Sequence, residues 1–125
     1  MRLILDAGAL IAIDRNDRRV AALIALARRL DADLITVAPV VGQAWRDGAR
    51  QARLARALAM TSVVPTTLAD GRAAGELLRA TGGGDVVDAV VALQARPGDQ
   101  VLTSDPDDLR ALLDARGVPA LSIRV

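Results

Sequence analysis

Apolar residues follow two patterns along the chain. Short uninterrupted runs, rich in Val, Ile and Leu, suit strands that are buried on both faces of a sheet. In longer stretches the apolar residues recur every three or four positions, which is typical of helices with one face on the core. Strands are expected at residues 3–5, 34–37, 62–64, 101–103 and 121–125, and helices at residues 8–13, 18–30, 39–58, 68–80, 86–95 and 106–115.

Proline and glycine punctuate this pattern. Pro39 stands where the longest helix would begin, and Gly117 stands where the last helix would end. Strands that alternate with helices imply right-handed crossovers and a parallel sheet covered on both faces. The pattern therefore predicts a single α/β domain over residues 1–125, a three-layer sandwich with a mostly parallel central sheet of four or five strands.

The composition removes several kinds of chemistry. The chain has no Cys, His or Lys, which excludes disulfides, thiolate and imidazole catalysis, Schiff bases and a Walker-A lysine. All 16 basic residues are Arg, and Glu76 is the only Glu among 15 acidic residues. Asp carboxylates can bind hard cations such as Mg²⁺ or Mn²⁺, and guanidinium groups can bind phosphate.

The apolar N-terminus has a second interpretation, as a signal peptide. Asp6 interrupts the run, however, and Asp14 and Arg15 follow without a small-residue cleavage site. No segment is long enough and apolar enough to span a bilayer. We therefore expect a buried strand that leads into a helix, and a cytoplasmic protein without a membrane segment.

Three Asp residues stand where strands end or helices begin. Asp6 follows strand 3–5, Asp105 follows strand 101–103, and Asp88 lies in the first turn of helix 86–95. If the first and fourth strands are neighbours, these carboxylates converge on one edge of the sheet, where ligands bind in α/β folds. Their mutual repulsion would be relieved by a divalent cation, which also activates water towards a phosphodiester.

Each of these acids also has a purely structural interpretation. Asp85 is a candidate N-cap of helix 86–95, and Asp88 would complement the dipole of that helix. Asp105 or Ser104 would cap the helix that Pro106 opens. Asp6 interrupts an apolar stretch, and no helix upstream of it needs a cap. The three acids together at one predicted edge of the sheet therefore favour a binding site over three separate helix caps.

Three segments resemble the motifs of PIN-domain ribonucleases, and in particular VapC-type toxins. They are ILDAGALIAI around Asp6, DVVDAVVAL around Asp88, and VLTSDPDDL around Asp105. Their order and spacing cover nearly the whole chain. The resemblance implies a metal-dependent endoribonuclease that hydrolyses RNA with a metal-activated water. It also implies Mg²⁺ or Mn²⁺ at Asp6, Asp88 and Asp105 with help from Asp85, a VapB-like antitoxin as partner, and a homodimer.

One position departs from the resemblance. PIN domains carry a Glu on the helix after the second strand, and this chain has Gln43 there. An amide oxygen can coordinate a cation but adds no negative charge, so weaker metal binding is expected. Asp47, one turn further on, and Asp85 are candidates to compensate; the alternative is that cleavage has been lost. The hydroxyls of Thr103 and Ser104 are candidates to position an acidic ligand or the water.

Arginine residues continue from Gln43 along the predicted helix 39–58. Arg46, Arg50 and Arg53 recur at helical spacing, which predicts a track for an RNA backbone beside the acidic site. The alternatives are a solvated helix face and a docking face for an acidic antitoxin segment. The opposite side, expected to pack on the core, comprises Val41, Trp45, Ala49 and Ala52.

Two other functions remain open. A PIN-like module that binds RNA or an antitoxin without cutting is favoured by Gln43, and a metal titration with a cleavage assay would discriminate it. A phosphotransferase or receiver-like domain with Asp6 as nucleophile lacks both the DxDxT pattern and any Lys. Formation of an acid-labile acyl phosphate would support that second reading.

Overall fold

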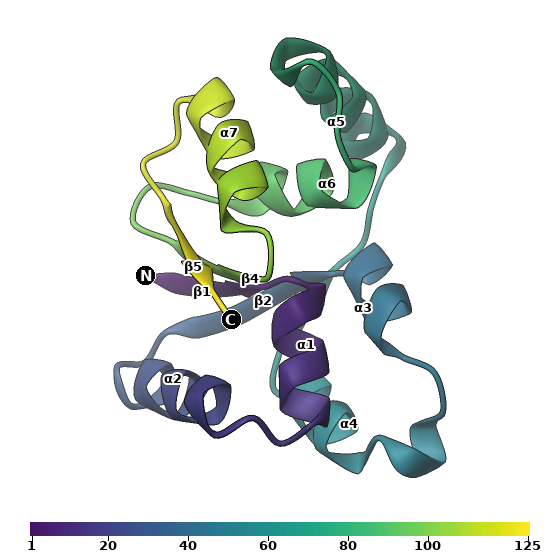
Figure 1. Ribbon diagram of the computed structural model, residues 1–125, viewed down its shortest axis with the longest axis vertical. Helices are drawn as coiled ribbons and strands as arrows, with labels where there is room; N and C mark the ends of the chain where they lie inside the picture. The colour runs from purple at the N-terminus through teal and green to yellow at the C-terminus, as the bar shows by residue number, and fades with distance from the viewer.

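The computed structural model describes residues 1–125 as an α/β sandwich built on five parallel strands (Figure 1). The strand order is β3-β2-β1-β4-β5, and every neighbouring pair is parallel. The fold class and the parallel sheet predicted from the sequence are therefore confirmed. The strands are β1 (Arg2–Leu5), β2 (Asp33–Val37), β3 (Ser62–Val64), β4 (Gln100–Thr103) and β5 (Leu121–Arg124).

Helices cover both faces of the sheet. Helices α1, α2 and α4 lie on one side, and α5, α6 and α7 lie on the other (Figure 1). The helices are α1 (Ala7–Asp14), α2 (Arg18–Arg29), α3 (Ala38–Ala44), α4 (Ala52–Ala59), α5 (Leu68–Thr81), α6 (Val86–Gln94) and α7 (Pro106–Arg116). No helix has the length and apolar character that crossing a bilayer requires.

The core is aliphatic, as a chain without Phe or Tyr requires. Strand β1 lies in the middle of the sheet, so its residues Ile4 and Leu5 are fully buried. Leu102 on β4 is buried beside them, and Leu10 on α1 and Val91 on α6 close the two faces. Burial on both faces explains why the strands read as uninterrupted apolar runs.

The prediction of one helix over residues 39–58 is wrong, because the helix is interrupted at Trp45. Helix α3 ends at Ala44, Trp45 has extended backbone angles (φ −76°, ψ 131°), and α4 begins only at Ala52. A single 3₁₀ turn, η1 (Gly48–Arg50), lies between them. The predicted apolar face is also wrong, because Trp45, Ala49 and Ala52 are exposed and only Val41 is partly buried.

The side chain of Gln51 explains the break. It is 6% exposed, and its Oε1 accepts hydrogen bonds from the backbone N–H groups of Arg46 (2.8 Å) and Asp47 (2.9 Å). Its Nε2 donates to the carbonyl oxygen of Ala44 (2.9 Å) and to Oδ2 of Asp14 (3.2 Å). These bonds satisfy backbone groups that a continuous helix would have paired within itself.

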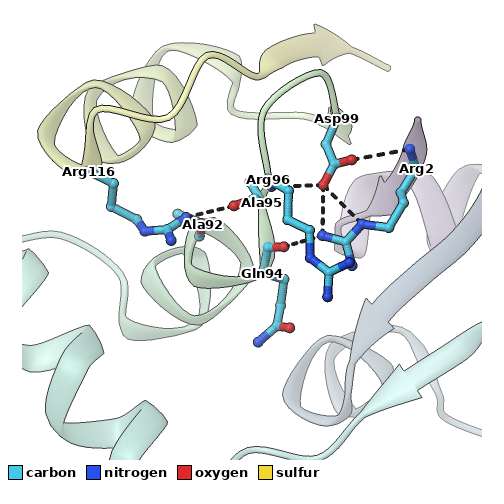
Figure 2. A network of polar contacts seen from close by, with 7 residues as sticks. All are labelled: Arg2, Ala92, Gln94, Ala95, Arg96, Asp99 and Arg116. Carbon is cyan, nitrogen blue, oxygen red and sulfur yellow. Dashed lines mark hydrogen bonds and ion pairs between the residues drawn. The ribbon is translucent and has the colours of Figure 1, made fainter.

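A buried ion pair fastens the start of the sheet, away from the carboxyl ends of the strands (Figure 2). Asp99, which precedes β4, is 3% exposed and accepts from the Arg2 guanidinium through Nη2 (2.7 Å) and Nε (3.1 Å). The backbone N–H groups of Arg2 (3.1 Å) and Arg96 (2.8 Å) complete its shell. Burial opposes ionisation, but these donors outweigh it and lower the pKa of Asp99.

Candidate functional site

Asp6 is held at the carboxyl end of β1 by its neighbours. It is 3% exposed, its Oδ1 accepts from the backbone N–H of Ala7 (2.8 Å), and its Oδ2 accepts from the Thr103 hydroxyl (2.7 Å). Thr103 ends β4, which pairs with β1 as the predicted convergence requires. Burial raises the pKa of Asp6, and the two hydrogen bonds offset only part of that rise.

Asp105 joins Asp6 through the same threonine. The Thr103 hydroxyl oxygen accepts from the backbone N–H of Asp105 (3.0 Å) while its proton goes to Asp6. The carboxylate of Asp105 makes no capping hydrogen bond, and neither does the hydroxyl of Ser104, so the predicted capping role of these two residues is wrong. The Thr103 hydroxyl thus contacts an acidic side chain, as predicted, and the role of Asp6 as a metal ligand stays a prediction.

Close packing at Gly8 brings the start of α1 next to the end of β4. A Cβ atom added at Gly8 would lie 2.9 Å from both Cβ and Oγ of Ser104. Real Cβ atoms do not approach side chains so closely, so any larger residue would move the start of α1 away from the end of β4. Gly8 therefore permits the short separation between the segments that carry Asp6 and Asp105.

The two acids of α6 have different roles. Asp85 caps the helix, as predicted, with Oδ1 accepting from the backbone N–H groups of Val87 (2.7 Å) and Asp88 (3.1 Å). Asp88 is half-buried and accepts no hydrogen bond from the protein. Burial, followed by repulsion from Asp6 and the other nearby carboxylates, raises the pKa of Asp88 to about 7.

A cavity of about 480 Å³ connects these groups. The sequence-predicted residues that line it are Asp6, Asp85, Asp88, Asp105, Gln43, Arg46 and Ser104. Arg50 and Asp47 line an adjoining cavity instead, and Arg53 faces a third one beside Arg28 and Arg56. The structure therefore brings the predicted acids together but disperses the predicted arginine face, because the helix that would have aligned it is broken.

Asp108 is a site residue that the sequence analysis missed. It lies in the first turn of α7, lines the cavity, and contributes to the raised pKa of Asp88. The available signal was its spacing of three residues from Asp105, which places both on one side of a helix start. Asp107, one residue earlier, does not line the cavity.

No basic residue neutralises this acidic cavity. The ion pairs in the structure are Arg2–Asp99 and Arg50–Asp47, and neither involves a carboxylate of the cavity. The one guanidinium in the lining, that of Arg46, donates to the carbonyl oxygens of Gly42 (2.9 Å) and Trp45 (2.7 Å). Five carboxylates and an amide thus line the cavity, and no basic side chain forms an ion pair with any of them.

This donor set fits a divalent cation in charge and in kind, because Mg²⁺ and Mn²⁺ bind carboxylate and amide oxygens. As the side chains stand, no group of three or more carboxylates is arranged to hold an ion. Repulsion between carboxylates favours such a spread arrangement. Asp6 and Asp85 in addition use their oxygens for backbone donors.

Asp88→Asn tests this electrostatic description by its effect on stability. The raised pKa means that ionising Asp88 costs free energy in the folded state; the cost is absent near pH 3, grows as the pH rises from the ordinary value of 3.8 to about 7, and is complete above it. In the presence of a chelator, we expect the variant to be more stable than the parent by about 2 kcal/mol at pH 8, roughly half of what the full shift would give, because water screens a half-buried carboxylate. Urea unfolding at pH 3 and pH 8 measures the difference.

The gain should almost vanish at pH 3, where Asp88 is protonated in both the folded and the unfolded parent protein. Asp33→Asn removes the same charge at an exposed position on β2 and should change stability little at either pH. An equal gain for Asp88→Asn at both pH values would mean that packing, and not charge, is responsible.

Comparisons with known proteins support the fold. No family model and no curated protein matches the chain. Among solved structures, the chain is similar to a chain of VapBC2 from Rickettsia felis bound to a DNA fragment from their promoter. The likeness covers 100% of this chain and 99% of that chain, with a TM-score of 0.67 and 12% sequence identity. The PIN-like fold implied by the sequence motifs is therefore confirmed, and at this identity the likeness concerns the fold alone.

Proposed function

We propose that this protein is a VapC-like toxin, an endoribonuclease that uses Mg²⁺ or Mn²⁺ to hydrolyse RNA. The observation that carries the proposal is the cavity at the carboxyl ends of β1 and β4, which five carboxylates line and where none of them forms an ion pair. The fold likeness to a chain of the VapBC2 complex supports a VapB-like antitoxin as partner. The homodimer stays a prediction.

Asp6, Asp88 and Asp105 would hold the cation, with Asp85, Asp108 and the Gln43 amide around them. When bound, the ion would neutralise the phosphodiester and lower the pKa of a water. Thr103 fixes the orientation of Asp6 and the backbone of Asp105 at once, so the two carboxylates keep their relative position. Arg46, at the edge of the cavity, is the group that can pair with a phosphate oxygen.

The wild-type protein tests this proposal directly. Because a cation would bind the folded state and relieve carboxylate repulsion, millimolar Mn²⁺ should raise the melting temperature and should be required for cleavage of single-stranded RNA. Identical melting curves in Mn²⁺ and in chelator would contradict the metal site. RNA binding without cleavage at any Mn²⁺ concentration would instead favour the non-cutting module that Gln43 leaves open.

Asp108 gives a sharper prediction about the site, because it comes with a matched control. If Asp108 supplies negative charge that Gln43 does not, Asp108→Asn should weaken Mn²⁺ binding about tenfold, the effect of losing an outer partner of a metal site. Asp107→Asn makes the same change one residue away, outside the cavity, and should leave the Mn²⁺ affinity close to that of the parent. Calorimetric titration with Mn²⁺ measures both, and equal affinities for the two variants would remove Asp108 from the site.

A further inference from the structure

A second cavity, of about 420 Å³, adjoins the acidic one. The two share Ile11, Gln43 and Arg46 in their linings, so they meet along these residues. We call the second cavity the basic cleft. The charge of the lining changes from the acidic cavity to the basic cleft. Beyond Arg46 the basic residues are Arg15 and Arg50, and none of the five acidic-site carboxylates is present.

The arginines of this basic cleft come from two segments that Gln51 ties together. Arg15 caps the end of α1, whereas Arg46 and Arg50 belong to the segment between α3 and α4. The buried Gln51 amide binds the backbone of that segment and also Oδ2 of Asp14, next to Arg15. The basic cleft therefore has two walls held at a fixed separation. Its arginines do not form a row on one helix face.

Most of the guanidinium N–H donors in the basic cleft are free. Arg15 makes no hydrogen bond or ion pair with its side chain, and Arg46 uses only one nitrogen, on backbone carbonyls. The two acids in the lining are occupied by the protein itself. Asp14 accepts from Gln51, and Asp47 accepts from the N–H of Ala49 (3.2 Å) and lies 3.7 Å from Nε of Arg50.

We infer that the basic cleft binds the sugar–phosphate backbone of the RNA strand next to the nucleotide that is cut. The inference rests on the proposed function for the position of the cut. Arginine forks match phosphate oxygens, and the shared residue Arg46 places the first such contact at the border of the acidic cavity. A strand that enters the acidic cavity continues past Arg46 into the region of Arg15 and Arg50.

The test measures binding of a fluorescent single-stranded 12-nucleotide RNA to the full chain in chelator, so that nothing is cut. Arg15→Ala and Arg50→Ala should each weaken binding several-fold and lower the slope of log affinity against log salt by about 0.7, the value for one lost phosphate contact on a single strand. Both residues are exposed, so both variants should fold. The matched control is Arg53→Ala, which lies on α4 outside the basic cleft and should bind as the parent does.

The outcomes separate this inference from the proposed function. Wild-type cleavage in Mn²⁺, combined with unchanged RNA binding by Arg15→Ala and Arg50→Ala, would overturn the basic cleft and leave the nuclease intact. The expected binding pattern without any cleavage would support the cleft and reject the nuclease. Loss of polyglutamate binding in the same variants, with RNA binding unchanged, would assign the cleft to an acidic protein segment and overturn the inference.

Discussion

Asp6→Asn is expected to lower the rate of RNA cleavage by about 100-fold to 1000-fold, the effect of removing one electrostatic stabiliser from a transition state. Asn has nearly the same shape, and its amide oxygen can still accept from the N–H of Ala7 or from Thr103. The fold should therefore persist. Because burial raises the pKa of Asp6, removing its charge should also raise the melting temperature in chelator. Gel-based cleavage and thermal melts on the same preparation measure both effects.

The prediction is specific because the cleavage rate should fall while the melting temperature rises. A variant that merely damages the fold would lose activity and stability together. Asp17→Asn is the control, since Asp17 caps α2 by accepting from the N–H of Val20 (3.0 Å) and Asn caps a helix equally well. Cleavage by Asp6→Asn at the wild-type rate would mean that the acidic cavity is not where the chemistry occurs, or that the activity belongs to a contaminating nuclease.

The parts of this structure that the sequence predicted are those set by local pattern. Strands β1 and β4 are short aliphatic runs because both faces are buried, and burial is visible in composition. Parallel neighbours place their carboxyl ends at one edge, so the sequence predicted that Asp6 and Asp105 converge if the first and fourth strands are neighbours. The structure supplies that condition, because β1 pairs with β4. The N-cap at Asp85 and the left-handed C-cap at Gly117 (φ 67°) are likewise local signals.

The parts that it did not predict depend on side chains that reach the backbone of distant residues. The helical periodicity of residues 39–58 does not mark the interruption at Trp45. The interruption is stabilised by the Gln51 amide, which bonds to the Ala44 carbonyl oxygen and to Asp14, 37 residues earlier in the sequence. Capping of the helix that begins with Pro106 was the structural alternative for Asp105 or Ser104, because such residues commonly precede helices. In the structure the N–H of Asp105, and not its carboxylate, makes the local bond, to Thr103.

The second large effect is expected on stability, at the buried pair of Arg2 and Asp99. Asp99→Ala would leave the Arg2 guanidinium, whose side chain is 15% exposed, without its carboxylate, and two backbone N–H groups without an acceptor. Removing one partner of a buried pair costs about 3–5 kcal/mol, and a domain of this size is stable by only about 5–15 kcal/mol. The midpoint of urea unfolding should therefore fall sharply. Because the pair joins residues 97 apart in the sequence, it had no local signature.

Asp99→Asn isolates the charge from the packing. Since the folded pKa of Asp99 is lowered, the stabilisation is complete above its unfolded value near 3.8 and is lost as the pH falls through the folded value. The Asn variant should therefore be less stable than the parent at pH 7, and the difference should shrink below pH 4. The exposed pair of Asp47 and Arg50, 3.7 Å apart, provides the comparison. Asp47→Asn should cost less than about 0.5 kcal/mol at pH 7, as surface pairs do. Equal losses for the two Asn variants would show that burial does not strengthen the Arg2–Asp99 pair.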